Sequence, residues 1–349
     1  MNKLRYATSH SAILLVAAFA TTNCSALAQN SGSQLSSVQS QAPMQNRTNR
    51  RIQELGGLSS IEKKLSEDPH NLKNYLIKAE IERESKDFEK EVQTLSAAIN
   101  NISKAESQAT LYALRAVAEM KLAQMEGRGR WQALSEQDMR KALQLNPLQA
   151  DANNLAGQKL LEQEKAKEAL AAFNLAVKAA PKNNDFLKSR ALALSANGDS
   201  QGACRDLEEA AKLAPDRYDI ALILASLYER AGEFKKAETS YDKAISIRPN
   251  KLNLKLDKCQ FYLRTKHFHE AIKDLDKVYN MAPSNDDVLR MRGECYFNLK
   301  EYSKAIKDYT SAIEMSPEVA PLLRARAKVY RAMGKESLAK EDERRAQSY

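Results

Sequence analysis

The chain has 349 residues, 28% of them charged, and a formal net charge of +9. It contains only 11 glycines and 9 prolines, and many Ala, Leu, Lys and Glu residues, which predicts helices rather than short strands joined by tight turns. The basic residues are interspersed with acids, so a solvated surface explains the charge and we expect no nucleic-acid partner.

Residues 1–28 have the layout of a secretory signal peptide. Lys3 and Arg5 precede the apolar run "AILLVAAFA", and small residues ending in "ALA" at 26–28 follow it. We expect cleavage after Ala28 and export to the periplasm or the exterior of a bacterium. The apolar run is shorter than the about 20 residues of a membrane-spanning helix, so we expect no transmembrane anchor after cleavage. The alternative is that the segment is kept as an anchor.

The next segment, 29–57, is predicted to be a disordered tether. Between Gln29 and Asn46, twelve of eighteen residues are Gln, Asn or Ser, and large apolar side chains are almost absent. Such a segment cannot bury enough surface to offset its chain entropy. The stretch "LSSIEKKLSEDP" at 58–69 then predicts a lone helix that caps the folded part.

A 34-residue period organises the rest of the chain. Six prolines are each separated by 34 residues: Pro147, Pro181, Pro215, Pro249, Pro283 and Pro317. Each proline ends a helix, because its ring removes a backbone donor and clashes one turn back. Repetition at this period indicates a helical solenoid.

The residue classes keep the same register as the prolines. Small residues lie 24 positions before the last five prolines, where two helices must cross closely: Gly157, Ala191, Ala225, Cys259 and Gly293. Bulky residues follow three positions later, at Leu160, Leu194, Tyr228, Tyr262 and Tyr296. A second helix carries a buried stripe of alanines and large side chains: Ala169, Ala203, Ala237, Ala271 and Ala305, with Phe173, Leu207, Tyr241, Leu275 and Tyr309.

With this combination of period, small crossing residues and terminal proline, the chain resembles the tetratricopeptide repeat family. The resemblance implies an all-α fold, a right-handed α-solenoid of about eight helix-turn-helix repeats in which the first helix of each pair lines a concave groove. We place the repeats at 72–105, 106–149, 150–183, 184–217, 218–251, 252–285, 286–319 and 320–349.

The second repeat is longer than one period, because Ser103 and Pro147 are 44 residues apart. We expect the excess to form a long inter-helix turn around "AQMEGRGRW", where two glycines interrupt the helix. Arg128, Arg130 and Trp131 in this stretch are residue types found at interface hot spots, so the turn is a candidate contact point. The alternative is that Trp131 packs on its own helices.

No motif for catalysis, a metal or a cofactor is found in the sequence. "HFHE" at 267–270 offers two histidines and a glutamate, but no further ligand completes a set. Asp274 and Asp276 lie two residues apart and so do not share a helix face, which favours solvated side chains. Cys259 falls on a crossing position and is interpreted as packing rather than as a nucleophile. We therefore predict a protein that is not an enzyme.

The candidate binding residues are those that the first helices present to the groove, 27, 23 and 20 places before each proline. They are neutral at first, with Asn154 and Gln158, then mixed, with Leu222 and Gln260. Charge accumulates in the last two repeats, at Arg290, Glu294, Phe297, Arg324, Lys328 and Arg331. Three cations spaced i, i+4, i+7 repel one another, so an acidic partner would stabilise them; pairing with nearby acids is the alternative.

The sequence thus predicts an exported scaffold that binds a protein or peptide segment in its groove. Chaperone-binding members of the family hold two carboxylates with Lys and Asn residues on three first helices. Here Arg324 and Lys328 resemble the final pair of that set, but Met291, Leu256 and Gln260 replace the others. A structural assembly factor or self-associating component of a bacterial envelope complex is the alternative function.

Overall fold

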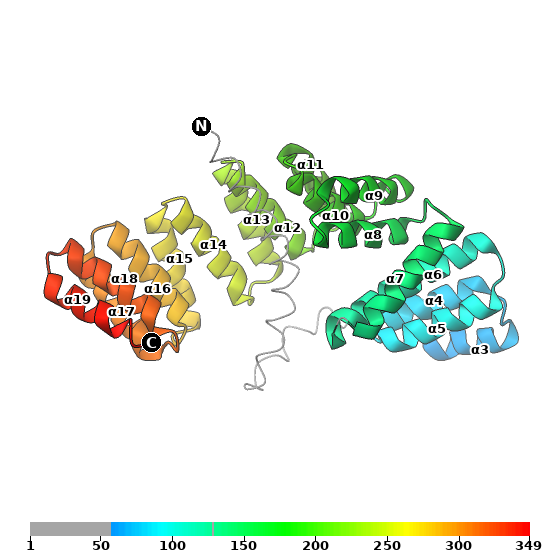
Figure 1. Cartoon of the computed structure of the whole chain (residues 1–349), viewed down its shortest axis with the longest axis horizontal. Helices are drawn as coiled ribbons and strands as arrows, with labels where there is room; N and C mark the ends of the chain where they lie inside the picture. The colour runs from blue at the N-terminus through cyan, green and yellow to red at the C-terminus, as the bar shows by residue number, and fades with distance from the viewer. Residues whose placement is uncertain (1–56, 128) are drawn as a thin grey trace. The chain divides into compact units, whose positions relative to one another are not determined.

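The computed structural model describes residues 57–127 and 129–349 (Figure 1). The predicted signal peptide, the tether up to residue 56 and Arg128 lie outside the described residues. The described residues form helices α3 to α19 and no strand, which confirms the predicted all-α class. None of these helices is both long enough and apolar enough to cross a membrane.

The chain divides into two compact units, residues up to Ala214 and residues from Pro215. The helices of the first unit are α3 (Leu58–Glu67), α4 (Leu72–Glu84), α5 (Phe88–Asn101), α6 (Ala105–Glu126), α7 (Gly129–Leu145), α8 (Ala150–Glu162), α9 (Ala166–Ala179), α10 (Asn184–Ala196) and α11 (Ser200–Leu213). Those of the second unit are α12 (Tyr218–Arg230), α13 (Phe234–Ile247), α14 (Leu252–Arg264), α15 (Phe268–Met281), α16 (Asp286–Asn298), α17 (Tyr302–Met315), α18 (Val319–Ala332) and α19 (Glu336–Arg345).

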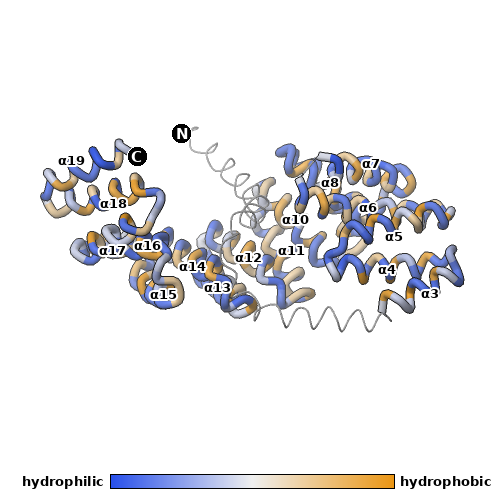
Figure 2. Tube along the Cα trace, turned by 90° about the horizontal axis from the view of Figure 1, so that it is seen from below, coloured by the Kyte–Doolittle hydropathy of each residue, from blue (hydrophilic) through white to orange (hydrophobic). Residues whose placement is uncertain are grey.

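Consecutive helices form hairpins that are held together at the predicted small residues. The alanines of the second-helix stripe, from Ala169 to Ala305, are fully buried. A Cβ atom added at Gly157 would lie 2.6 Å from the ring of Phe173, and one at Gly293 would lie 3.1 Å from the ring of Tyr309. A larger residue would push the helices apart, so the small residues set the helix spacing. Figure 2 shows the resulting alternation of hydrophobic and hydrophilic residues along the helices.

The first helix of a hairpin ends in a left-handed residue, again at a 34-residue period. Gly198, Gly232 and Gly334 have positive φ at this place, but in other hairpins a side chain occupies it, as at Glu164, with φ 61°. The N–H of Glu164 donates to the carbonyl of Leu161, and the next N–H donates to that of Leu160. This double hydrogen bond is the Schellman arrangement that ends a helix. A non-glycine residue adopts it at a cost of about 1 kcal/mol.

We predict that Glu164→Gly stabilises the first unit by about 0.5 kcal/mol. Relief of the left-handed strain outweighs the entropy that glycine adds to the unfolded chain. The measurement is the midpoint of chemical denaturation followed by circular dichroism. Ala171→Gly, at an exposed position inside α9, is the control and should destabilise by about 1 kcal/mol. A lower midpoint for Glu164→Gly would contradict the argument.

A second repeated contact, which we call the clasp, links three helices. A basic side chain on a first helix binds an aspartate on its own second helix and a polar group on the second helix of the preceding hairpin. Arg292 donates to both carboxylate oxygens of Asp308 at 2.8 Å and to Asp276 at 2.7 Å. The other clasps are Arg115 with Asp138 and Ser96, Arg190 with Asp206 and Asn174, Lys258 with Asp274 and Asp242, and Arg326 with Asp342 and Thr310.

The clasp corrects the interpretation of Asp274 and Asp276 as merely solvated. The two carboxylates do point to different sides of α15, as the spacing requires. Asp274 lies 3.6 Å from Lys258 on one side, and Asp276 accepts from Arg292 on the other. Each is therefore one end of a clasp, and α15 is held between its two neighbours.

We predict that Arg292→Met destabilises the second unit by about 3 kcal/mol, because it leaves Asp308, 4% exposed, buried without its cation. Adding Asp308→Leu should recover most of this loss, since no charge then remains buried. Arg290→Met is the control: Arg290 makes an exposed pair with Asp287, and its loss should cost less than about 1 kcal/mol. Denaturant midpoints measure all three, and equal losses for Arg292→Met and Arg290→Met would rule out the clasp as a major contribution.

The long second repeat differs from the prediction of an extended turn. The extra residues lengthen the helices instead, to 22 residues in α6 and 17 in α7, against 13 and 14 in the hairpin that follows. Only residues 127 and 128 separate the two helices. Ala, Gln, Met and Glu before Gly127 are good helix formers, so α6 continues until Gly127, whose φ is +109°.

Candidate protein-binding surface

The candidate groove residues of α16 are already engaged with one another. Arg290 donates to Asp287 at 3.0 and 3.1 Å and lies 4.0 Å from Glu294. The ring of Phe297 is half-buried, 6.2 Å from that of Tyr302. This helix therefore presents a neutralised surface with an aromatic edge.

The cations of α18 differ from one another, although the sequence treats them as one set. Arg331 is paired with Glu343 at 2.6 Å and with Glu336 at 3.6 Å, so the acids of α19 neutralise it. Arg324 and Lys328 are exposed and make no hydrogen bond or ion pair within the described residues. The predicted cluster of three is thus reduced to two unpaired cations, one helical turn apart.

The remaining candidates lie in two separate units. In the first, Gln158 is exposed, whereas Asn154 is buried and its Oδ1 has no hydrogen-bond partner in the described part of the chain. In the second, Leu222 and Gln260 are half-buried. Leu222 packs against the cluster of Ala221, Ala244 and Leu254. These residues offer packing and hydrogen bonding rather than charge.

The tip of the long hairpin holds its side chains by local contacts. Trp131 is half-buried, and its Nε1 donates to Glu126 at 2.8 Å. The Arg130 guanidinium lies 5.4 Å from the centre of the Trp131 ring. This favours packing of Trp131 on its own hairpin, while Met125 beside it is 67% exposed.

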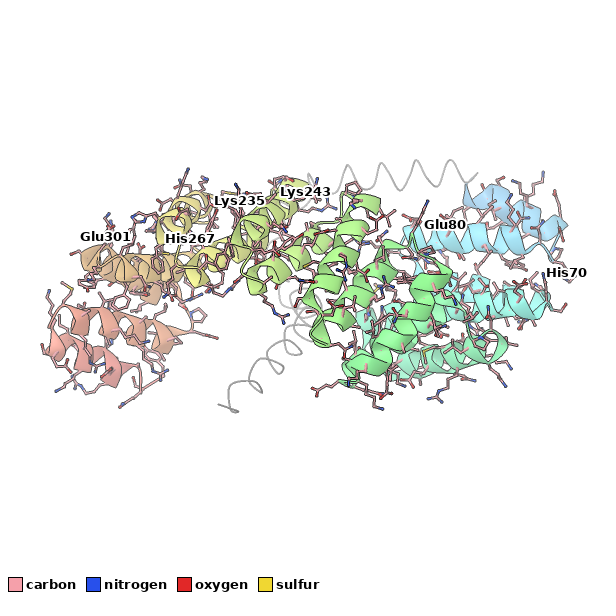
Figure 3. The ribbon with its side chains drawn as sticks, turned by 90° about the horizontal axis from the view of Figure 1, so that it is seen from above. His70, Glu80, Lys235, Lys243, His267 and Glu301 are labelled. Carbon is pink, nitrogen blue, oxygen red and sulfur yellow. The ribbon has the colours of Figure 1, made fainter. Side chains whose placement is uncertain are left out.

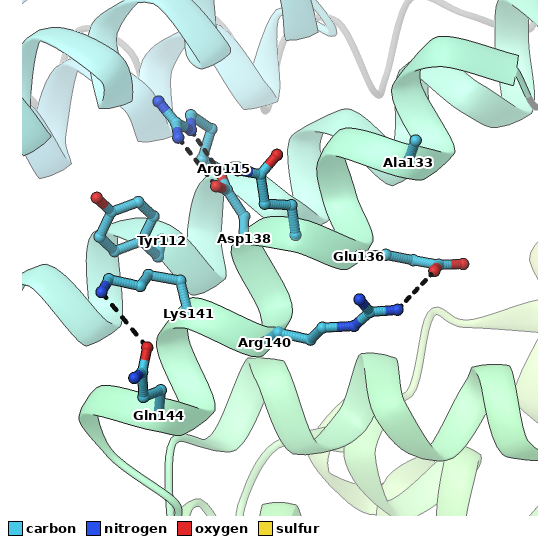
Figure 4. A pocket seen from close by; sticks show the side chains of 9 residues that line it. Tyr112, Arg115, Ala133, Glu136, Asp138, Arg140, Lys141 and Gln144 are labelled. Carbon is cyan, nitrogen blue, oxygen red and sulfur yellow. Dashed lines mark hydrogen bonds and ion pairs between the residues drawn. The ribbon is translucent and has the colours of Figure 1, made fainter.

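A surface hollow lies between α6 and α7 (Figure 4). Its charged side chains are paired: Arg115 with Asp138, Arg140 with Glu136 at 3.5 Å, and Lys141 with Gln144 at 3.4 Å. The hollow is thus lined mainly by charged side chains that engage one another, and Lys141 is held only by a neutral amide.

Two reactive side chains that the sequence singles out, Cys259 and His267, lie elsewhere, and only the cysteine is buried. Burial raises the pKa of the Cys259 thiol to about 12, so the thiolate that would act as a nucleophile is not formed at neutral pH. His267 Nδ1 lies 2.9 Å from the hydroxyl of Thr265. No cluster of three or more His, Cys, Asp or Glu with the geometry of a metal site is found in the described ranges.

Sequence reasoning missed two buried glutamates on first helices, Glu82 and Glu119. Glu119 follows the clasp residue Arg115 by four positions, as Tyr296 follows Arg292, so the 34-residue alignment could have found it once the insertion was placed. It is 3% exposed, one of its oxygens has no partner among the described residues, and the other lies 4.0 Å from Arg115. Burial, and then the charge of Asp138, raises its pKa to about 8.

Comparison with known proteins agrees with the repeat pattern. Models of the tetratricopeptide repeat match residues 132–184, 189–251 and 287–319. No curated protein matches the chain.

Solved structures of similar fold include a tetratricopeptide repeat protein from Parabacteroides merdae, 19% identical, covering 70% of this chain and 93% of its own, with a TM-score of 0.49. MamA from Desulfovibrio magneticus RS-1 is 19% identical, covers 47% of this chain and 93% of its own, with a TM-score of 0.41. YrrB, described as having an unusual peptide-binding site, is 17% identical, covers 54% and 97%, with a TM-score of 0.44.

Glu119 makes the stability of the first unit depend on pH. Its pKa is about 8 in the folded chain, against 4.5 for an ordinary glutamate. Between these values the folded state holds a proton that the unfolded state lacks, so stability falls as the pH rises, by up to about 1.4 kcal/mol per pH unit. Burial raises the pKa of Glu82, Glu91 and Asp151 in the same unit as well, so Glu119→Gln should reduce this slope rather than abolish it, and should be more stable than the natural chain at pH 9.

The slope is measured from denaturant midpoints taken at several pH values between about pH 5 and about pH 9. Glu106→Gln, at the exposed first turn of the same helix, is the control and should leave it unchanged. Parallel pH profiles for Glu119→Gln and the natural chain would show that Glu119 is ionised throughout.

Proposed function

Because this chain belongs to the tetratricopeptide repeat family, we propose that it is a protein-interaction scaffold that binds an acidic protein or peptide segment on its first helices. The family fold supports protein–protein interaction as its general role. Proteins built of these repeats are generally non-enzymatic. We also propose that it acts after export, because residues 1–28 have the layout of a secretory signal.

The observation that carries the choice of an acidic segment is the pair of unpaired cations on α18. Arg324 and Lys328 are exposed, whereas the neighbouring cations Arg290 and Arg331 are each bound to acids. Two ammonium or guanidinium groups one turn apart suit two carboxylates of an extended peptide. The half-buried ring of Phe297, on the preceding first helix, would add an apolar contact.

In the second unit, the cations that hold the helices together differ from those that are exposed and unpaired within the described residues, which supports this proposal. Cations such as Arg292 are half-buried between helices, where aspartates bind them. Glu229, also a groove position, is bound by Arg264 at 2.6 and 2.8 Å. Arg324 and Lys328 are therefore available to a partner without the loss of a structural contact.

The test is the affinity of the full chain for a fluorescein-labelled oligoglutamate peptide, measured by fluorescence polarisation. Arg324→Glu with Lys328→Glu should weaken binding roughly tenfold or more, since each exposed charge pair contributes up to about 1 kcal/mol and reversal adds repulsion. Higher salt should reduce the affinity of the natural chain.

The matched control is Lys340→Glu with Arg344→Glu on α19, which changes the net charge equally away from the proposed contact. It should bind the peptide nearly as well as the natural chain. Equal loss in both double variants would show that net charge alone attracts the peptide. Unchanged binding in both would reject the α18 pair.

A further inference from the structure

A separate surface of the second unit is formed by three inter-helix turns, which we call the turn edge. It comprises residues 232–236, 266–270 and 300–304, each of which runs from the inter-helix turn into the first turn of α13, α15 or α17. Each turn brings an aromatic residue to the start of the second helix, next to basic residues. The aromatic residues are Phe234, Phe268 and Tyr302.

The turns are neighbours in space as well as equivalent in sequence. The ring of Phe234 lies 6.5 Å from that of His267 in the next turn, and 6.4 Å from that of Phe261. Figure 3 labels Lys235, His267 and Glu301, one residue from each turn. The 34-residue period repeats the same step to the third turn, so the turns follow one another along one edge.

Cations are left over on this edge. Lys235, Lys266 and Lys300 are exposed and have no ion-pair partner among the described residues. Glu233 is neutralised by Lys236, and Glu301 by Lys304. Glu270, also exposed, offsets one of the three lysines, so the edge keeps a net positive charge.

Two of these lysines occupy a backbone conformation that disfavours them. Lys266 and Lys300 have φ of 63° and 62°, where Gly232 and Gly334 stand in other hairpins of the same unit. Glycine would end the helix without strain. A strained residue that folding does not require is a reason to look for a function of its side chain.

We propose that the turn edge docks on the surface of an anionic phospholipid bilayer. The phosphates of a bilayer are spread over its surface, and lysines spaced along an edge can each bind one of them by electrostatic attraction. Phe234, 44% exposed beside Lys235, can enter the headgroup layer while the lysine meets the phosphates. A soluble acidic protein or a nucleic acid would match the charge but offers no apolar layer for the ring. The surface is distinct from Arg324 and Lys328 on α18, so either proposal can fail alone.

The test is cosedimentation of the full chain with vesicles of phosphatidylcholine alone or with about 30 mol% phosphatidylglycerol. The natural chain should bind the anionic vesicles more tightly, and salt should remove the difference. Lys235→Glu with Lys266→Glu and Lys300→Glu should lower anionic-vesicle binding roughly 100-fold or more, at about fivefold for each lysine. Glu164 stands at the corresponding left-handed position of the first unit, so glutamate is compatible with the fold there.

The matched control is Lys63→Glu with Lys64→Glu and Lys86→Glu in the first unit, which includes a left-handed lysine and changes the net charge equally. It should keep anionic-vesicle binding. The apolar run near the N-terminus is common to all variants and both vesicle types, so it cancels in the comparison. Equal binding to both vesicle types, or equal loss in the control, would overturn the proposal.

Phe234→Ser separates a bilayer from a soluble polyanion. It should weaken binding to anionic vesicles roughly tenfold, because the ring loses its apolar environment. Binding of the same variant to duplex DNA or to polyglutamate in solution should not change. If Phe234→Ser has no effect on vesicles, or if DNA or polyglutamate binds the turn edge as tightly as vesicles, the partner is a soluble polyanion and the proposal is wrong.

Discussion

The structure depends on the close approach of two helices at a small residue. A carbon atom added at Gly157 would overlap the ring of Phe173, and one added at Gly293 would press against that of Tyr309. The same contact recurs with the fully buried Ala191, Ala225 and Cys259. Because each hairpin is closed in the same way, each offers the next the same surface to pack on. The clasps then join one hairpin to another within each unit.

The sequence was sufficient to predict this architecture because the close crossing of two helices requires small residues at fixed positions, and residue size can be read from the sequence. Glycine or alanine at a crossing, a bulky group one turn later and a proline at the exit are all visible at a fixed period. The sequence says less about which charged residues bind one another. Asp276 and Asp308 look alike as polar helix residues in the sequence, yet both bind Arg292, and Asp308 is buried whereas Asp276 is exposed.

The same difference explains the outcome for the candidate surface. The i, i+4, i+7 spacing placed Arg324, Lys328 and Arg331 on one helix face, but the neutralisation of Arg331 depends on α19, whose contact with α18 spacing alone does not give. The insertion was located correctly but predicted as a turn, because two glycines dominated the local pattern. Residues before Gly127 with high helix propensity extended α6 instead.

Charge in the second unit follows from the demands of packing. Aspartates of the second helices bind Lys258, Arg292 and Arg326 on the first helices, and two of them, Asp308 and Asp342, are buried. Acids used in this way no longer balance the lysines at the surface. The way in which the hairpins are joined therefore partly determines which charges remain exposed. The few cations that have no acid partner within the described residues can bind other molecules.

The long α6–α7 hairpin shows how such a protein can change length without losing its order. The clasp of Arg115 with Asp138 and Ser96 lies away from the tip, so added helical turns project outward and leave the joint with the preceding hairpin intact. The tip is thus the natural place to graft a foreign peptide or reporter. An insertion at a crossing residue would instead change the register of that helix and displace the contacts that follow it in the unit.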